Sequence, residues 1–419
     1  LRTVAGFDMS RTYLKHSLPT SRGILQTHYA NKMLVMINNV PTWHAVTGEG
    51  NLERVNIRDV ERIEVLKGPA SVKYGSNSYS GAVNIVLKKI GHKRFYVGGG
   101  SDGLLMTGVS AGKDKNQFFL NVQDIDGYDF SYTDENGVTG NVEDYVKNSN
   151  FTWLHQSQNH KVLANTYRGG EGYLGVLPRN ASGAGIEHEL EGRLISYEFK
   201  KDLNKRDQFK FHSSYDWNER DLARNATDRA DIAGYRFTTG ILFQREQRKD
   251  FNWEFGWDYD ARTSQSYRNY NSLTGQNLGE NNLNEKDVWE YSFFGNAMWE
   301  GRKIHSAAGI RYTKNELFGN NTALHLTFVR PLAENRSVKF IYAQSYRAPS
   351  LFELNFETAT GTVFGDPNLE PEESTSFELA YLEKKGCVFF QTTVYRANYE
   401  NKILRTRGDG IGPTGTVYT

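Results

Sequence analysis

Asn31–Lys89 reads NKMLVMINNVP, then after a polar segment RDVERIEVLKGPASVKYGSNSYSGAVNIVLKK. Three apolar runs in it have the length of strands, namely Met33–Ile37, Ile63–Leu66 and Ala82–Leu87. Each of these runs borders a cluster of Gly, Pro, Asn or Ser, the residues that form turns. The segment therefore predicts a small unit of short strands joined by tight connections.

Four elements of this segment stand in a fixed order: Asn38–Pro41, Val60–Pro69, Tyr74–Ser80 and Gly81–Ile85. They resemble the plug domain of TonB-dependent outer-membrane receptors. In that family a strand ends in a D/N-G/N-V-P turn, and V/I-E-R-I/V-E-V-x-R/K-G-P, Y-G-S/T-x-A/S and G-x-V/I-N-I follow. The resemblance implies an α+β plug domain, which we expect to span residues 1–92.

Two boxes near the other end of the chain are similar to the same family. YAQSYRAPSLFELNF (Tyr342–Phe356) resembles its F/Y-R-A-P box, and GDPNLEPEESTSFELAY (Gly365–Tyr381) resembles its N-P-N-L-x-P-E box, with Asp366 where Asn is commoner. The segment between the plug motifs and these boxes, roughly residues 101–335, resembles the family only in its strand-like segments of alternating polarity.

The composition allows a large β-rich protein and disfavours several other classes. The chain has 419 residues, so two domains are the first expectation. A net charge of +1 gives no general attraction to nucleic acid, and the single cysteine, Cys387, excludes an intrachain disulfide. Aromatic residues make up 13% of the chain. No apolar run is long enough for a membrane-spanning helix, but transmembrane barrels hide their apolar surface in alternating strands.

From about Arg94 onward, segments of roughly ten residues alternate in polarity. In the segment from Phe251 to Asp260 the odd positions carry aromatic residues and the even positions are mostly polar. The segment from Trp289 to Trp299 repeats this pattern with aromatic or small residues at its odd positions. Such rows suit either the core of a soluble sandwich or the lipid face of a barrel.

The connections between these segments favour the barrel. Short charged turns are expected at residues 113–116, 158–160, 204–207, 247–250, 301–303, 333–336 and 384–386. Long polar loops are expected between them at residues 169–189, 221–231, 263–285 and 348–373. Short turns on one rim and long loops on the other are typical of outer-membrane barrels.

The predicted fold is therefore mainly β: an antiparallel transmembrane barrel over residues 93–419, with the plug in its lumen. About fifteen or sixteen strands are visible, whereas the family uses twenty-two. We expect further C-terminal strands beyond Thr419, and a signal peptide and TonB-coupling segment before Leu1. The alternative is a sixteen-stranded barrel, which a plug of this type would crowd.

The resemblance also suggests residues that hold the plug in the barrel. Arg22 lies in SRGIL, where the family has an I/L-R-G element, and Lys67 stands where the family more often has Arg. Glu378 follows the second box at a position where the family places an inward glutamate. We name these three residues the lock. Because Lys lacks the bidentate fork of Arg, the lock is expected to be weaker at Lys67. The alternative for each residue is an ordinary surface or lumen charge.

Candidate ligand contacts lie in predicted loops. By resemblance, the loop after Pro41 is an apical plug loop, in which Trp43 can stack on a planar ligand and His44 can ligate a haem iron. The alternative is that Trp43 packs on the barrel wall and His44 is merely exposed. Further candidates in or near long loops are Tyr173, His188, Tyr267 and Tyr270. No resident cofactor or metal site is predicted, since the histidines lack metal-site spacing.

The function implied by the resemblance is active import across the outer membrane of a Gram-negative bacterium, driven by TonB with ExbB and ExbD. A ferric siderophore is the favoured cargo, and haem, cobalamin or another metal complex are the alternatives. Haem is disfavoured because no histidine stands between the two boxes, at residues 350–366. No nucleophile motif indicates an enzyme. The rivals from other classes are a passive porin, a signalling or adhesion receptor and a soluble β-rich enzyme or lectin.

Overall fold

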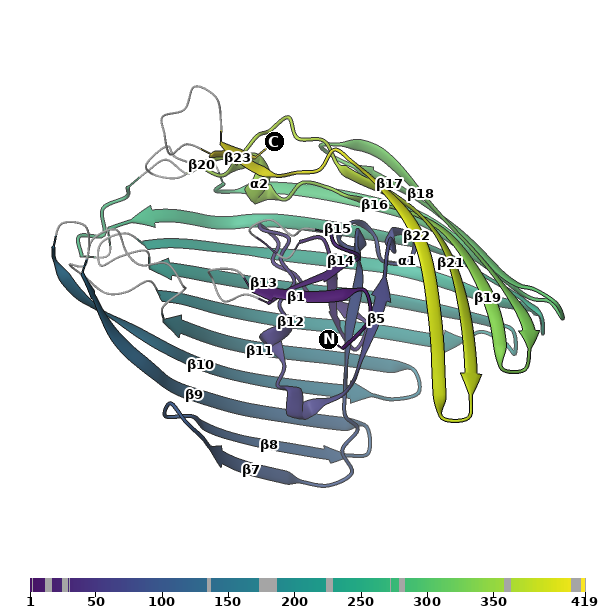
Figure 1. The fold of residues 1–419 in the computed structure, drawn as a ribbon, viewed down its shortest axis with the longest axis horizontal. Helices are drawn as coiled ribbons and strands as arrows, with labels where there is room; N and C mark the ends of the chain where they lie inside the picture. The colour runs from purple at the N-terminus through teal and green to yellow at the C-terminus, as the bar shows by residue number, and fades with distance from the viewer. Residues whose placement is uncertain are drawn as a thin grey trace.

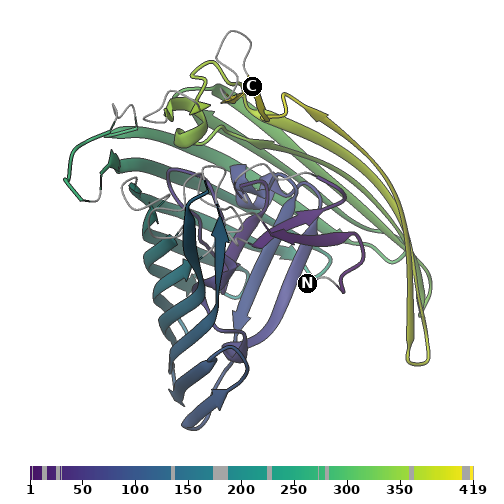
Figure 2. The ribbon, with the colours of Figure 1, turned by 60° about the vertical axis from the view of Figure 1, so that its left-hand side comes forward.

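The computed structural model describes residues 1, 3–11, 17–24, 29, 31–133, 137–172, 187–223, 229–271, 273–278, 283–357, 363–407 and 416–418. A large curved sheet dominates it, and a small four-stranded sheet lies on the concave side of that curve (Figures 1 and 2). We refer to the described part of residues 1–92 as the plug and to the large sheet as the wall. No helix in the described residues is both long and apolar enough to cross a membrane.

The wall has 15 antiparallel strands, each paired with the wall strands next to it in the chain. This agrees with the predicted fifteen or sixteen strands. Among the described residues the first and last strands form the two edges of the sheet. The strands are β7 (Arg94–Gly99), β8 (Leu105–Lys113), β9 (Asn116–Thr133), β10 (Thr139–Gln156), β11 (His160–Gly172), β12 (Glu187–Asp202), β13 (Asp207–Ala223), β14 (Arg229–Arg248), β15 (Phe251–Tyr270), β16 (Lys286–Glu300), β17 (His305–Asn315), β18 (Gly319–Ala333), β19 (Arg336–Arg347), β21 (Glu372–Lys385) and β22 (Val388–Glu400).

The two faces of the wall differ in polarity because side chains alternate along each strand. In β9, Phe118, Leu120 and Val122 are exposed on the convex face, whereas Asn121 is buried on the concave face. The register pairs Trp257 with Phe293 and Tyr259 with Tyr291, so the two predicted aromatic rows share one face. An apolar outer face and a polar inner face form the pattern expected of a wall that faces lipid.

Aromatic residues gather where strands meet the short turns. Phe118 stacks on Trp153 with ring centroids 6.4 Å apart, and Phe243 lies 5.6 Å from Trp253. Trp299 at the end of β16 is 45% exposed. Such a girdle is typical of the level at which a barrel meets the membrane surface.

The seven short turns expected from the sequence all join consecutive strands at one rim, which we call the short-turn rim. At the opposite, long-loop rim the predictions need correction. Residues 169–172, 187–189, 221–223, 229–231 and 263–270 were expected in loops but belong to strands β11 to β15, since the hairpins extend further than the sequence alternation suggested. Two connections at this rim, residues 100–104 and 316–318, are short. Helix α2 (Leu351–Asn355) and the strands β20 (Val363–Phe364), β23 (Arg405–Arg407) and β24 (Thr416–Tyr418) also lie at this rim (Figure 1).

The plug is built around a sheet with the order β4-β3-β6-β5. Asn38 and Asn39 both have positive φ, 49° and 67°, which fits the two-residue turn between β3 and β4. The plug elements are β1 (Phe7–Arg11), β2 (Ser17–Ser21), β3 (Leu34–Ile37), β4 (Val40–Pro41), β5 (Val60–Lys67), the helix α1 (Ser71–Tyr74) and β6 (Gly81–Leu87), with 3-10 turns at Leu52–Arg54, Ile57–Asp59 and Ser76–Ser78.

Candidate functional site: the interface between plug and wall

Buried ion pairs and apolar clusters both join the plug to the concave face of the wall. In two of the clusters apolar plug residues, such as Val46, share the core with apolar wall residues, such as Ile232. The charged residues of the concave face need charged or polar partners when the plug docks there. Among the described residues, four buried ion pairs cross the interface, each with one residue on the plug and one on the wall. They are Arg22–Glu378, Lys32–Glu372, Glu49–Arg220 and Arg54–Asp216.

The most deeply buried contacts form what we call the outer network: Asn31 and Lys32 of the plug with Arg347, Glu353 and Glu372. Glu372 at the start of β21 accepts from Lys32 Nζ at 2.6 Å and from Arg347 Nε at 2.5 Å. Arg347 also forms a bidentate contact with Glu353, at 2.8 and 3.2 Å. Asn31 Nδ2 donates to the same Glu353 at 3.2 Å. The network therefore joins the plug, the end of β19 and helix α2.

The local structure of α2 fixes Glu353 in this network. Ser350 caps the helix, and its backbone N–H donates to Glu353 Oε2 at 2.8 Å in a capping box. Burial by itself raises the pKa of Glu353, but the Arg347 guanidinium outweighs it and holds that pKa below its usual range. Burial lowers the pKa of Lys32, although Glu372 opposes this shift. These ions are stable inside the protein because each charge has a close partner.

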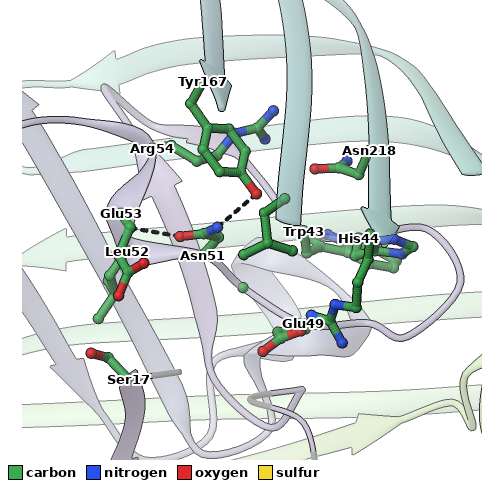
Figure 3. A pocket seen from close by; sticks show the side chains of 13 residues that line it. Ser17, Trp43, His44, Glu49, Asn51, Leu52, Glu53, Arg54, Tyr167 and Asn218 are labelled. Carbon is green, nitrogen blue, oxygen red and sulfur yellow. Dashed lines mark hydrogen bonds and ion pairs between the residues drawn. The ribbon is translucent and has the colours of Figure 1, made fainter. Parts of the chain in front are cut away.

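A second contact fastens the plug to β13. Arg54 donates to both carboxylate oxygens of Asp216, at 2.9 and 2.8 Å, and both side chains are 1% exposed. Tyr167 of β11 lies against the guanidinium, with its ring centroid 5.3 Å away, and accepts a hydrogen bond from Asn51 (Figure 3). Gly192 of β12 makes room, since a Cβ there would lie 2.7 Å from Arg54 Nη2. Arg54 therefore sits in a shaped, bidentate site.

Two lock residues meet as the sequence suggests. Arg22 Nη1 lies 2.5 Å from Glu378 Oε1, and both side chains are nearly buried. Gly68 has a φ of +88°, and a Cβ there would lie 2.5 Å from Arg22 Nη1 and 3.2 Å from Glu378 Oε1. The glycine of the KGP signature thus leaves the space that this ion pair occupies. The guanidinium also lies 4.8 Å from the ring centroid of Tyr395 on β22.

The third lock residue does not join them. Lys67 Nζ donates to the backbone carbonyl of Ala5 at 3.0 Å, and this contact is exposed. Its partner thus lies within the plug, because the lysine leaves the signature strand on the side that faces Ala5. The structure therefore brings together Arg22 and Glu378 and leaves Lys67 apart.

The apical candidates lie inside the interface. Trp43 and His44 are each 6% exposed, so neither forms an open ligand surface in this structure. The alternative expectation that His44 is merely exposed is therefore wrong. The Trp43 ring centroid lies near two wall arginines, 4.3 Å from Arg236 and 5.3 Å from Arg262. His44 accepts a hydrogen bond from the backbone of Val46, and burial lowers the pKa of its imidazole to about 3. The imidazole of His44 is therefore neutral and enclosed.

The remaining candidates are dispersed. His188 is 1% exposed and lies in β12, not in a loop. Tyr267 is also 1% exposed and packs edge-on against Phe356 at 5.4 Å. Tyr270 is partly exposed at the end of β15, with its ring 5.3 Å from Arg268. Tyr173 lies outside the described residues. Burial thus leaves Tyr270 as the described candidate with the most open position.

Several interface residues were not singled out from the sequence. Arg347 and Glu372 stand inside the two recognised boxes, as the Arg of RAP and the second Glu of LEPEE, so the motifs contained the signal. Arg54 and Asp216 lie in segments without a motif, 162 positions apart. No local pattern in the sequence marks them as partners.

Comparison with known proteins decides the family. The family model described as "TonB-dependent Receptor Plug Domain" matches residues 1–82, and the model "TonB dependent receptor-like, beta-barrel" matches residues 117–419. The chain belongs to the TonB-dependent receptor family. Among curated relatives of this receptor, the vitamin B12 transporter BtuB of Photobacterium profundum is 25% identical over 94% of the chain. The ferric enterobactin receptor of Pseudomonas aeruginosa is 22% identical over 84% of it.

Solved structures agree on the fold of this receptor. A mutant of the ferric enterobactin receptor PfeA from Pseudomonas aeruginosa matches with a TM-score of 0.73 and 16% identity, over 100% of this chain and 71% of that one. The copper transporter OprC also gives 0.73, at 14% identity over 100% and 70% of the two chains. The chain spans 62% and 57% of the lengths of the two curated relatives named above.

Proposed function

We propose that this chain is the plug and part of the barrel of a gated import receptor in the outer membrane of a Gram-negative bacterium. The observation that carries the proposal is the set of buried ion pairs between the plug and the concave wall. A plug domain that must leave its position and return is best held by charged groups, because water can solvate these groups when the contact opens. The ion pairs at Arg22, Lys32, Glu49 and Arg54 satisfy that requirement.

Membrane placement is supported by the convex face of the wall. Exposed apolar side chains recur across neighbouring strands, among them Phe118, Ile195, Phe255, Phe293 and Ile310. Monomeric soluble proteins rarely expose a continuous apolar surface of this kind, whereas lipid covers it in a barrel. The short-turn rim would then face the periplasm and the long-loop rim the outside.

The mechanism that we propose has two stages. Cargo binds between the long loops and the top of the plug, and binding shifts the plug toward a state that engages TonB, which works with ExbB and ExbD. The pull then loosens the ion pairs and opens a path beside the plug. Helix α2 is placed to report binding, because the Phe352 N–H donates to the carbonyl of Val46 in the apical plug loop at 2.9 Å.

The cargo that we favour is a ferric siderophore. Two of the similar proteins are the ferric enterobactin receptor and the probable TonB-dependent siderophore receptor PirA of Acinetobacter baumannii, which is 23% identical over 88% of this chain. Tyr270 is the described candidate best placed to meet a cargo, and Tyr173, which lies outside the described residues, remains a candidate from the sequence. Trp43 and His44 would join the site only after the apical loop moves.

A corrinoid is the second candidate cargo. The observation that favours it is the vitamin B12 transporter, which is 25% identical over 94% of this chain. A corrinoid and a ferric catecholate both have flat ring systems with which the Tyr270 ring can make contact. Growth assays separate the two directly.

The test is growth of a receptor-deleted host that expresses the full-length protein. Ferric catecholate, hydroxamate and carboxylate siderophores, haem and cyanocobalamin are supplied one at a time. We expect a ferric siderophore to restore growth, and restoration should vanish in the same host without TonB. Growth on cyanocobalamin alone would establish the second candidate. No growth on any compound, with the protein folded in the outer membrane, contradicts the import proposal.

A further inference from the structure

Trp43 separates two cavities that lie at different heights between the plug and the wall. Among the described residues that line them, Trp43 is the one shared by both. The outer pocket is otherwise lined by residues such as Arg54 of the plug and Tyr167 and Asn218 of the wall (Figure 3). Tyr167 and Asn218 lie in the halves of β11 and β13 that are nearer the long-loop rim. The inner chamber extends to Lys161 and Glu254, beside the short turns. The Trp43 indole therefore borders both cavities.

The two cavities differ greatly in size. The outer pocket has a volume of about 30 Å³, which holds roughly two water molecules. The inner chamber has about 680 Å³, within the range of sites that hold small-molecule ligands. A metal chelate thus fits the chamber but not the outer pocket. Cargo that moves along this side of the plug must first displace what closes the outer pocket.

The lining of the chamber suits a hydrated cargo. It combines hydroxyl and amide groups with charges of both signs, so that neither sign dominates. The wall contributes Lys161, Ser196, Glu198, Lys210, Ser214, Thr238, Glu254, Asp258 and Asn296. A polar passage with balanced charge binds weakly enough for release, as a conduction path requires.

Trp43 is held in place by cations of the wall and by apolar residues of the plug. Its ring centroid lies 4.3 Å from Arg236 and 5.3 Å from Arg262, and Asp260 pairs with both arginines, at 2.6 and 3.1 Å. Trp43 also belongs to a buried apolar cluster with residues of β3 and β6. The loop that follows Trp43 fits closely against β14. A Cβ at Gly234 would lie 2.6 Å from Val46 Cγ2. The indole is therefore held against two wall cations and by a loop that packs closely on β14.

We propose that Trp43 is the septum of the cargo passage, which runs along β11 to β17 between plug and wall. In the closed receptor the indole separates the inner chamber from the outer pocket. When the apical loop moves, Trp43 leaves the arginine pair, and the two cavities join. The inference rests on the proposed import function, but its test requires neither a known cargo nor TonB.

The test is conductance of the purified full-length receptor in planar lipid bilayers. Cys387 is exposed, and it is first replaced by Ser together with any further cysteine of the full-length receptor, so that introduced cysteines react alone. Trp43→Ala should raise the conductance at least about tenfold, because it makes the open connection the major state. With Thr238→Cys added in the chamber, a negatively charged methanethiosulfonate reagent should abolish this conductance. Trp43→Phe, which keeps a ring between the arginines, should stay closed.

Two matched variants separate a septum from general loosening. Thr327→Cys lies in a different cavity, on the β18 to β21 side of the plug, and its modification should leave the Trp43→Ala conductance unchanged. Arg22→Ala breaks the contact with Glu378 and tests whether any weakening of the plug has the same effect. If gel electrophoresis shows that Trp43→Ala does not form a folded barrel, Trp43→Leu is tested in its place.

The proposal is overturned if the folded Trp43 variant does not conduct, or if its conductance is insensitive to modification at Thr238. It is also overturned if Arg22→Ala conducts equally and is blocked at the same position. The two proposals can fail separately. If no compound in the growth panel restores growth but modification at Thr238 still blocks the conductance, the import function is rejected and the role of Trp43 as a septum stands.

Discussion

The outer network and the lock both fasten the plug, but their environments differ. In the outer network, Lys32, Arg347, Glu353 and Glu372 are at most 1% exposed, and each carboxylate contacts more than one donor. In the lock, Arg22 and Glu378 form one pair at the edge of solvent, and Lys67 turns to Ala5. The position that family resemblance emphasises is thus the less buried of the two.

This difference indicates how the plug is held. A buried charge that loses its partner costs several kcal/mol, whereas an exposed pair is worth little. The outer network also includes Ser350 and Glu353 of helix α2, so it links the plug to the rim where cargo is expected. We infer that plug release depends more on the outer network than on the lock, and four measurements test this ranking.

The largest effect is expected for Glu372→Ala. The substitution leaves Lys32 and Arg347 buried without their shared carboxylate and should destabilise plug docking by about 3–5 kcal/mol. The urea midpoint for trypsin cleavage of the plug in the folded barrel measures it. Glu373→Ala, at the neighbouring exposed position, is the control and should change the midpoint little. If both variants lower the urea midpoint equally, the buried network does not hold the plug more strongly than an exposed residue does.

The second effect concerns Arg54 and Asp216. Arg54→Met and Asp216→Leu should each cost about 3 kcal/mol, and the double variant should recover most of that loss, since no charge is then left buried alone. The same urea assay gives the coupling energy. Arg168 and Glu189 form an exposed pair at 2.9 Å, and their cycle should give below about 1 kcal/mol. A coupling no larger for the buried pair would contradict the ranking by burial.

The third effect is pH dependence through His44. Its pKa is about 3 in the docked plug and 6.5 when exposed, so the undocked state binds the proton first. The stabilisation is complete above pH 6.5 and is lost as the pH falls toward 3, by at most about 1.4 kcal/mol per unit. The urea midpoint of His44→Gln should therefore fall less steeply below pH 6.5 than that of the unmodified receptor. If the urea midpoints of the two proteins fall equally steeply with pH, His44 is not the source of the pH dependence.

The smallest effects separate the members of the lock. Arg22→Ala should cost roughly 1–2 kcal/mol, because the remaining Glu378 gains access to water, and Lys67→Ala should cost less than about 0.5 kcal/mol. Charge reversal by Glu378→Lys should lower the urea midpoint further than Arg22→Ala, since two cations then face each other. A Lys67 variant that matches Arg22→Ala would mean that the lock acts as three residues.

The sequence predicted the elements of this fold better than the contacts between them. The signature from Val60 to Pro69 became β5 and the turn that follows it, and the seven short turns lie where charge and strand spacing placed them. Both features depend on neighbouring residues, so they can be read locally. The prediction failed at residues 263–270, where polar residues continue a strand because hairpin partners supply the hydrogen bonds.

The candidate site was predictable only where a motif named the residue. Arg22 and Glu378 were singled out by resemblance and lie together, whereas the pairing of Lys32 with Glu372 joins positions 340 residues apart. The burial of Trp43 likewise depends on Arg236 and Arg262, which stand on two wall strands. No property of the sequence WHAV indicates that two distant arginines enclose its first residue.

By itself the sequence determined that this chain forms alternating strands, because strand periodicity and turn chemistry act over a few residues. The resemblance of its first motifs to a known family identified the plug. The tertiary structure alone decided which charges pair, that His44 stays neutral, and that Trp43 stands between a pocket and a chamber. These outcomes depend on the curvature and register of 15 paired strands, which set the distances between residues hundreds of positions apart.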